Sequence, residues 1–369
     1  MIMQSNRRNW LKQAGIVAAG IGLQSFNGLS ASASVHFGSK PADGKIRLDA
    51  NENPYGPSPI ARAAMTAAIN DCNRYNWDIR TSLRTAIAKK LGAGEDSILL
   101  GAGSTEILEL VVRYAAVEKG SFVIADPTFG YWAETAQRLG MEKIVVPLGA
   151  DKRHDLPAML NAIKPGTKLV YLCNPNNPTG TLCDREELLS FIQKATRKAM
   201  VMLDEAYLDF TGQQSLCDQV TDIKNLVIVK TFSKIHGMAG ARVGYAIAHP
   251  DTIEKISRLQ LWSNGSVSVI SAAGAMMSLK DSEFLSTTSI LNEKAKEYST
   301  EQLEKLNITC IPSHTNFIYF SLADYDKDFF KRLENNNIVG TRIYEEKGKW
   351  SRITVGTMEE MQQFIAAVA

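Results

Sequence analysis

The stretch Leu226-Val227-Ile228-Val229-Lys230-Thr231-Phe232-Ser233-Lys234 joins a continuous apolar run to a lysine. Such a run is typical of a buried strand, so Lys234 is predicted to lie just past a strand end. Arg242 follows eight positions later. A Schiff base to a phosphate-bearing aldehyde needs an amine, which Lys234 supplies. It also needs groups that hold the phosphate, which the Ser233 hydroxyl and the Arg242 guanidinium can provide. The alternative is an ordinary solvated loop lysine, so the interpretation depends on other segments.

Apolar runs and helical patterns alternate on both sides of this stretch. Strands are predicted at 96–101, 121–125, 168–173, 199–204, 226–229 and 243–248. Helices are predicted between them at 107–115, 132–139 and 185–197. Because the strands lack polar alternation, their sheet is expected to be covered on both faces. The sequence therefore predicts an α/β fold with a mostly parallel sheet.

The pattern changes after about residue 271. A long helical pattern at 283–306 precedes short strand patterns at 316–321, 342–344 and 352–355, which is the order of a smaller α+β domain. We expect residues 73–271 to form a large domain and 272–369 a small one. Residues 41–72 are expected to be an N-terminal segment that joins the small domain.

Composition excludes several classes of function. The chain has 369 residues, 45% hydrophobic and 22% charged, which suits a soluble protein large enough for two domains. A net charge of +2 gives no reason to expect a nucleic-acid surface. The five cysteines contain no C-x-x-C pair, so no metal site is expected.

Residues 1–33 are predicted to be a signal peptide. The segment Asn6-Arg7-Arg8-Asn9-Trp10-Leu11-Lys12 resembles a twin-arginine export signal. The apolar stretch at 14–23 is too short to span a bilayer, and Ala31-Ser32-Ala33 offers a cleavage site after Ala33. We expect an exported, periplasmic protein without a stable membrane span. The alternative is a disordered tail or a weak membrane anchor, on an otherwise cytoplasmic protein.

The segment Gly101-Ala102-Gly103-Ser104-Thr105-Glu106 lies between a predicted strand and a predicted helix. Its glycines let the backbone approach an anion, and the helix N-terminus supplies N–H groups and a positive dipole end. Ser104 and Thr105 add hydroxyl groups. One alternative is that Ser104 only caps the helix. A dinucleotide site is the other, but Glu106 replaces the third glycine of that motif.

Three further strand ends are followed by residues that suit an aromatic cofactor. Asn177, in the turn after 168–173, could donate to a phenolate oxygen. Asp204 ends the 199–204 strand and needs a partner if it is buried, for which a protonated pyridine nitrogen is suitable. Phe129, after 121–125, could stack on a ring. The alternatives are a plain turn and a core aromatic residue.

Together these segments resemble the fold-type I enzymes that use pyridoxal 5'-phosphate (PLP), and most closely the histidinol-phosphate aminotransferase group. The resemblance runs from about Ile46 to the C-terminus, in the family's order. It implies an aspartate aminotransferase-like fold, with a large PLP domain and a smaller α+β domain. The matching motifs are Asp49-Ala50-Asn51-Glu52-Asn53-Pro54-Tyr55-Gly56-Pro57-Ser58, Gly103-Ser104-Thr105-Glu106, Asn176-Asn177-Pro178-Thr179-Gly180, Asp204-Glu205-Ala206-Tyr207, Thr231-Phe232-Ser233-Lys234 and Arg352-Ile353-Thr354-Val355-Gly356-Thr357.

The resemblance also implies a role for each residue near the cofactor ring. Lys234 is expected to form the Schiff base with PLP and later to carry the Cα proton. Asp204 is expected to hold the pyridine N–H, which keeps the ring an electron sink. Asn177 and Tyr207 would hydrogen-bond to the phenolic oxygen, and Phe129 would stack on the ring.

The resemblance also assigns residues to the binding of the phosphate and of the substrate. The expected phosphate contacts are Ser104, Thr105, Ser233 and Arg242. Tyr75 is expected to reach the phosphate of a partner subunit, which implies a homodimer. Arg352 would bind the substrate carboxylate through two parallel hydrogen bonds, and Asn53 is placed with it at the substrate. Without the resemblance, Arg352 would be interpreted as a surface arginine.

The implied reaction is PLP-dependent transamination between an L-amino acid, or a related amine such as histidinol phosphate, and a 2-oxo acid. One alternative is a PLP-dependent decarboxylase of the threonine-phosphate type. The other is a non-catalytic binding protein on the same fold, but a protein that only binds needs neither Lys234 nor Asp204. The sequence leaves the substrate open. It also leaves open which Cα bond is broken.

Overall fold

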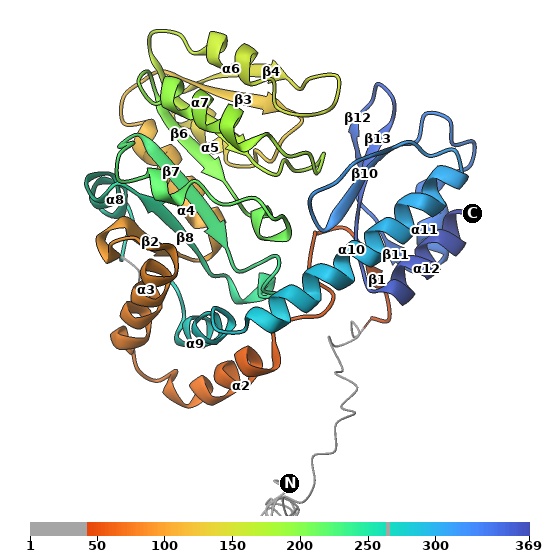
Figure 1. The fold of residues 1–369 in the computed structure, drawn as a ribbon, viewed down its shortest axis with the longest axis horizontal. Coiled ribbons are helices and arrows are strands. Elements are labelled where there is room, and N and C mark those ends of the chain that lie inside the picture. The colour runs from red at the N-terminus through yellow and green to blue at the C-terminus, as the bar shows by residue number, and fades with distance from the viewer. Residues whose placement is uncertain (1–42, 263–265) are drawn as a thin grey trace, which may run out of the picture. The chain divides into compact units, whose positions relative to one another are not determined.

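The central element is a seven-stranded sheet, and the strands in its interior contain continuous apolar runs (Figure 1). The computed structural model describes residues 43–262 and 266–369; the predicted signal peptide at 1–33 lies outside them. The strand order is β2-β8-β7-β6-β5-β3-β4. β8 is antiparallel to both of its neighbours and the other pairings are parallel, so the mostly parallel sheet is confirmed. The strands are β2 (Ile98–Gly101), β3 (Ser121–Asp126), β4 (Glu142–Pro147), β5 (Thr167–Cys173), β6 (Met200–Asp204), β7 (Leu226–Thr231) and β8 (Gly244–Ala248).

Both faces of this sheet are buried, which explains the continuous apolar runs. Successive residues of a strand point to opposite faces. In β6, Val201 and Leu203 join one hydrophobic core, and Met200 and Met202 join the other. The first core is covered by α3 (Trp77–Leu91), α6 (Leu156–Ala162), α7 (Arg185–Ala195) and α9 (Val269–Ser278). The second is covered by α4 (Gly103–Ala115), α5 (Ala133–Arg138) and α8 (Pro250–Ser257).

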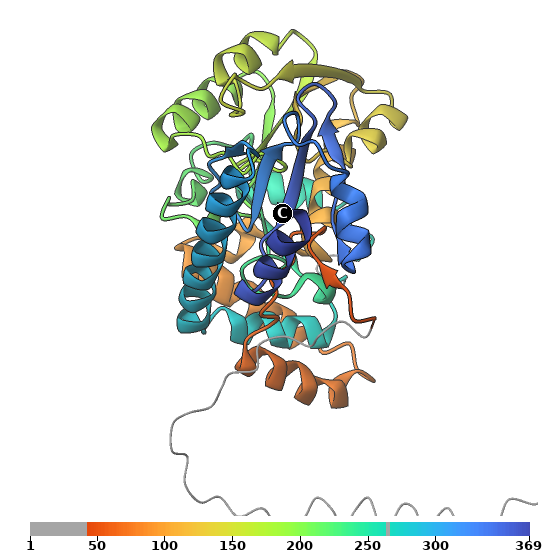
Figure 2. The ribbon, with the colours of Figure 1, turned by 90° about the vertical axis from the view of Figure 1, so that its right-hand side faces the viewer.

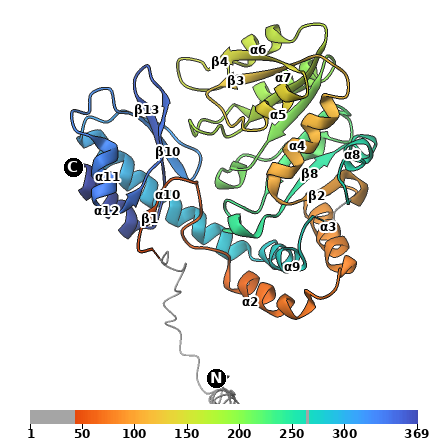
Figure 3. The same ribbon diagram turned by 180° about the vertical axis from the view of Figure 1, so that it is seen from behind.

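A separate four-stranded antiparallel sheet of order β12-β13-β10-β9 follows in the sequence (Figures 2 and 3). It consists of β9 (Cys310–Ile311), β10 (Phe317–Ser321), β12 (Ile343–Glu345) and β13 (Trp350–Thr354). Helices α10 (Ser282–Lys305), α11 (Phe329–Asn335) and α12 (Met358–Val368) pack with it around a third core. This α+β region agrees with the expected fold. The domain boundaries at residues 72 and 271 stay predictions.

The N-terminal segment of the described chain is tied to the C-terminal region. β1 (Ile46–Arg47) pairs in parallel with β11 (Ile338–Val339), and α2 (Pro59–Ala68) packs on α9. The remaining helical turns are 3₁₀ turns at Ile69–Asp71, Glu95–Ser97, Leu208–Phe210, Cys217–Gln219 and Ala239–Ala241. Within the described ranges, no helix combines the length and the apolar character that a bilayer crossing requires.

Strand direction brings the functional segments to one edge of the large sheet. The parallel strands β3, β5, β6 and β7 have their carboxyl ends together, and in open α/β sheets this edge is where ligands bind. Gly101, Gly244 and Thr231 lie side by side in the register of β2, β8 and β7. The α4 N-terminus and the Ser233-Lys234 segment therefore leave the sheet beside each other.

Candidate active site

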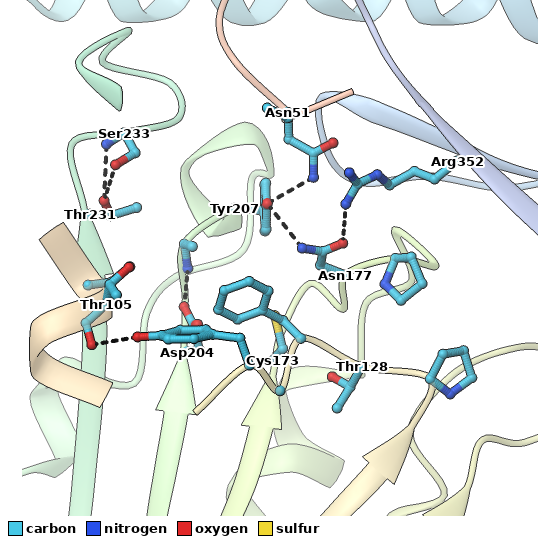
Figure 4. Close-up of a pocket in the computed structure, with 18 of the residues that line it drawn as sticks. Asn51, Thr105, Thr128, Cys173, Asn177, Asp204, Tyr207, Thr231, Ser233 and Arg352 are labelled. Carbon is cyan, nitrogen blue, oxygen red and sulfur yellow. Dashed lines mark hydrogen bonds between the residues drawn. The ribbon is translucent and has the colours of Figure 1, made fainter. Parts of the chain in front are cut away.

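A cavity of about 770 Å³ lies at this carboxyl edge (Figure 4). Its walls come from the strand ends, the start of α4, residues 50–52 and the strands β12 and β13. In Figure 4, Thr105 and Ser233 lie on one side of the cavity, Arg352 and Asn177 on the other, and Asp204 below. The predicted residues that line it are Ser104, Thr105, Phe129, Asn177, Asp204, Tyr207, Ser233, Lys234, Arg242 and Arg352. One cavity thus contains groups that the sequence places in distant segments.

Asp204 ends β6 beneath the cavity and is almost fully buried. Its Oδ2 accepts a hydrogen bond of 3.1 Å from the Tyr171 hydroxyl, and its Oδ1 accepts one of 3.0 Å from the Ala206 N–H. Burial raises the pKa of the Asp204 carboxyl to about 6, because a charged group is poorly solvated there. A cation in the cavity would favour the carboxylate, and the protonated ring nitrogen of PLP is such a cation.

Lys234 follows β7, and its Nζ donates hydrogen bonds of 3.2 Å to the backbone carbonyls of Ala50 and Asn51. Burial, and after it the positive charge of Arg352, lowers the pKa of Lys234 to about 8. A lowered pKa leaves more of the amine neutral near neutral pH, which is the nucleophilic form. The position and the chemistry of Lys234 therefore fit an imine to an aldehyde.

Tyr207 lies at the centre of a hydrogen-bond network (Figure 4). Its hydroxyl oxygen accepts from Asn51 Nδ2 at 3.0 Å and from Asn177 Nδ2 at 3.4 Å. Burial raises the pKa of Tyr207, so the hydroxyl keeps its proton and can donate it to a ligand oxygen. This arrangement suits the phenolic oxygen of PLP. Asn51 belongs to a matched motif, but sequence reasoning did not single it out as a site residue.

Arg352 is a buried residue of β13, so its interpretation as a surface arginine is wrong. Its Nη1 donates to Asn177 Oδ1 and its Nη2 to the Asp49 carbonyl, both at 2.6 Å. Its Nε is buried and has no hydrogen-bond partner within the described part of the chain. A buried guanidinium with an unused donor at the cavity wall fits an anionic ligand group.

The start of α4 forms a cradle for an anion. The Arg242 guanidinium donates to the Ala102 carbonyl at 3.4 Å, to Thr105 Oγ1 at 3.3 Å and to Ser233 Oγ at 3.4 Å. Gly103 has a φ of +77°, and a Cβ there would lie 2.3 Å from Arg242 Nη2. The first N–H groups of a helix have no partners within the helix, so they can bind phosphate. These residues fit the phosphate of PLP.

The alternative that Ser104 caps the helix is wrong. α4 begins at Gly103 with Ala102 at the cap position, and no side chain caps it, so Ser104 does not act as the cap. Glu106, which stands where a dinucleotide site would have glycine, accepts hydrogen bonds of 2.6 Å from the Ala102 N–H and the Ser266 hydroxyl. The Glu106 side chain thus stabilises this loop through hydrogen bonds that a glycine could not form.

Phe129 is half-buried in the cavity wall, and its ring lies 5.4 Å from that of Tyr131. Tyr131 also lines the cavity, and its hydroxyl donates to the Thr105 carbonyl at 2.9 Å. Sequence reasoning missed Tyr131. The available signal was its position in the same loop as Phe129, two residues further on. The stacking of Phe129 on a cofactor ring stays a prediction.

Two predicted residues lie outside the cavity wall. Asn53 is buried, and its Nδ2 donates to the Ile235 carbonyl at 2.8 Å, beside Lys234. Its contact with substrate stays a prediction. Tyr75 is 63% exposed and packs against Trp77 and Trp262, with ring centroids 5.7 and 5.0 Å away. Its role at a partner's phosphate also stays a prediction.

Residues 43–262 and 266–369 contain no cluster of side chains suited to a metal ion. The polar groups of the cavity instead match the parts of PLP one by one. Asp204 suits the ring nitrogen, Tyr207 and Asn177 the phenolic oxygen, Lys234 the aldehyde and the α4 cradle the phosphate.

Comparison with known proteins gives a consistent result. The family model described as aminotransferase class I and II matches residues 43–368. The chain is 34% identical to a histidinol-phosphate aminotransferase of Moorella thermoacetica, over 88% of this chain and 84% of that one. It is 36% identical to histidinol-phosphate aminotransferase 2 of Ralstonia nicotianae, over 88% and 87%. The histidinol-phosphate aminotransferase of Sinorhizobium meliloti, solved in complex with PLP, is 26% identical and matches with a TM-score of 0.81, over 93% and 98%.

Proposed function

This chain belongs to the class I and II aminotransferases, and from that membership we propose that its amino donor is histidinol phosphate or a related L-amino acid or amine. It is a PLP-dependent enzyme that transfers the amino group between this donor and a 2-oxo acid. The observation that carries this function is the presence of Lys234, Asp204 and the α4 cradle in one cavity.

Bound PLP supplies an electron sink that makes the Cα proton of the donor removable. The carboxylate of Asp204 keeps a proton on the ring nitrogen. Tyr207 and Asn177 donate hydrogen bonds to the ring oxygen. Two lysines of the described chain line the cavity, Lys143 and Lys234, and Lys143 is an exposed residue of the edge strand β4. The Lys234 amine is the group proposed to take the Cα proton and return it.

Arg352 orients the donor. Its guanidinium can bind a carboxylate or a phosphate through two hydrogen bonds, because its planar fork matches both groups. Arg342 and Tyr344 of the β12 region also line the cavity, and the Tyr344 ring lies 5.3 Å from each of the two guanidinium carbons. Two guanidinium groups in one wall suit a donor with anionic groups.

The decisive experiment is a screen of amino donors, histidinol phosphate among them, against the purified PLP-loaded enzyme with 2-oxoglutarate. We expect the visible absorbance of the bound cofactor to disappear on addition of a donor and to return with 2-oxoglutarate. Release of CO₂ in place of glutamate formation would instead indicate the decarboxylase alternative. The similarity to proteins named histidinol-phosphate aminotransferases favours transamination. If histidinol phosphate alone gave no reaction, that donor would be excluded, but the aminotransferase reaction with other donors would not.

The proposed active unit is a homodimer in which Tyr75 completes the phosphate site of the neighbouring subunit. The exposure of Tyr75, Trp77 and Trp262 as one aromatic cluster supports this proposal, since exposed aromatic groups are common at interfaces.

Export of the folded, PLP-loaded enzyme by the twin-arginine route is proposed on the sequence of residues 1–33. Arg7→Lys combined with Arg8→Lys should retain the precursor in the cytoplasm, because the pair itself is recognised and not only its charge. Cell fractionation and N-terminal sequencing test this. A wild-type protein that stays in the cytosol and begins at Met1 would exclude export.

A further inference from the structure

Lys152 and Glu345 form an ion pair between the two sheets. Lys152 lies in the loop after β4 of the large sheet, and Glu345 ends β12 of the small one. Lys152 Nζ donates to both carboxylate oxygens of Glu345, each at 2.9 Å. The Tyr319 hydroxyl donates to Glu345 Oε1 at 2.6 Å. The side chains are 17% and 26% exposed, so solvent screens this pair less than a fully exposed one.

The structure around Lys152 is built to hold its side chain. Its φ is +63°, a conformation that glycine or asparagine adopts more readily than lysine. The Thr181 hydroxyl donates to the Lys152 carbonyl at 2.8 Å. Nζ lies 4.8 Å from the centre of the Trp350 ring, which in turn stacks on Tyr319 at 5.3 Å. The Lys152 ammonium group is therefore held between the Glu345 carboxylate and the Trp350 ring.

Glu345 belongs to the strand that forms one wall of the active-site cavity. Tyr344, its neighbour, lines that cavity, and Arg342 lies two residues before Tyr344 in the same wall. The register between β12 and β13 shifts between Ile343 and Glu345. Such a bulge re-aims the side chains next to it. Tyr344 thus faces Arg352, while Glu345 faces Lys152.

β12 is a three-residue edge strand that pairs, among the described strands, only with β13. Ile343 packs on the third core, and the Ser351 hydroxyl donates to the Arg342 carbonyl at 2.9 Å. The Lys152–Glu345 pair adds a contact from β12 to the loop after β4 of the large sheet. We propose that the Lys152–Glu345 pair is a positioning element for substrate binding, which keeps Tyr344 and Arg342 in the cavity wall. This inference rests on the proposed function: Lys152 and Glu345 are assigned an effect on substrate affinity and no part in the chemical step.

The test compares Lys152→Gln, Glu345→Gln and the double variant in the PLP-loaded enzyme. Each single variant should raise KM for the amino donor about fivefold to tenfold, an effect in the range of one ordinary hydrogen bond, and change kcat less than about twofold. The double variant should be little worse than either single one, because both remove the same interaction. The dissociation constant of 2-oxoglutarate for the PLP form, measured by calorimetry without turnover, should rise by a similar factor.

Lys168→Gln is the matched control. It removes the ion pair of Lys168 Nζ with Glu118 Oε2, 2.5 Å long, whose residues do not line the cavity. KM, the 2-oxoglutarate affinity and kcat should not change in this variant. Thermal unfolding and PLP content of all four variants show whether each folds.

Unchanged KM and 2-oxoglutarate affinity in both single variants would overturn the proposal and leave the pair a purely structural contact. An equal effect of Lys168→Gln would overturn it as well. If the wild type had no aminotransferase activity, the proposed function would fail. The calorimetric comparison of 2-oxoglutarate affinity would then still decide the role of the pair.

Discussion

Arg352 Nη1 donates a hydrogen bond of 2.6 Å to Asn177 Oδ1, across the gap between the small sheet and the turn after β5. The amide nitrogen of the same Asn177 donates to the Tyr207 hydroxyl. A substrate anion that binds Arg352 competes with Asn177 for the guanidinium. Under the proposed roles, substrate binding would therefore alter the hydrogen bonding of Asn177 and Tyr207.

Lys234→Ala should leave a folded protein to which PLP cannot be fixed by borohydride. The wild type should instead carry the pyridoxyl group on the peptide that contains Lys234, because this amine lies in the cavity with a lowered pKa. Mass spectrometry of the digested, reduced protein measures this. A pyridoxyl mass on another lysine of the wild type would make the assignment wrong.

Asp204→Ala should lower kcat by well beyond the roughly 10²–10⁴-fold that is typical of losing one acid–base group. The reason is that no carboxylate would then hold the proton on the ring nitrogen. Asp204→Asn preserves the shape of the side chain and removes only its charge. An equal loss of kcat in this variant would show that the charge is what matters. Steady-state kinetics decide it, and a variant with most of its activity would exclude this role.

The stability of the cofactor-free protein should depend on Asp204 between pH about 4 and about 6. In this window the folded chain keeps a proton that the unfolded chain, with a pKa near 3.8, has lost. Stability contributed by this group therefore falls as the pH rises, by about 3 kcal/mol for a shift of about two pKa units. Urea unfolding of the wild type and of Asp204→Asn measures this as the difference between their pH profiles. Parallel profiles would contradict it.

Gly103→Ala should weaken PLP binding by about tenfold or more, because the new Cβ displaces the Arg242 guanidinium from the phosphate cradle. Gly140→Ala is the control: its φ of +88° imposes similar backbone strain, but nothing lies within 4 Å of its Cβ. Fluorescence titration of the cofactor-free variants gives the two affinities. Equal losses would show that the effect comes from backbone strain and not from the cradle.

Tyr75→Phe should weaken PLP binding without unfolding the chain, since it removes one hydrogen bond worth about 0.5–1.5 kcal/mol, or up to about 3 kcal/mol to a charged phosphate. The expectation depends on a homodimer, so sedimentation must accompany the titration. A fully active monomer would contradict both the homodimer and this role of Tyr75.

The strands that the sequence predicts correctly are those buried on both faces. Each contains an apolar run of at least three residues, such as Met200 to Leu203 in β6 and Leu226 to Val229 in β7, which burial on both faces requires. β4 is not predicted because most of its residues are exposed and it ends in a proline. The other edge strand, β2, is buried throughout and is predicted, so burial and not position in the sheet decides which strands the pattern finds.

The same contrast applies to the site. Lys234, Asp204 and Asn177 could be found because each follows an identifiable strand. Asn51 could not be chosen over Asn53 from the motif, because the choice depends on backbone geometry. Asn51 has a φ of +54°, which directs its amide to Tyr207, whereas the amide of Asn53 is bound by the Ile235 carbonyl. Such a turn has no sequence pattern of its own.

The pairing of β1 with β11 has a consequence for the order in which a ribosome releases the chain. The residues that suit the cofactor lie between Ser104 and Arg242, so all of them have been synthesised by the time β8 is complete. Asn51 emerges before them, yet its segment has no strand partner until Ile338 appears. The wall proposed to bind substrate, with Arg342, Tyr344 and Arg352, is thus synthesised last. Arg352 lies far beyond Arg242 in the sequence, so the proposed phosphate cradle leaves the ribosome before the residues proposed to select the substrate.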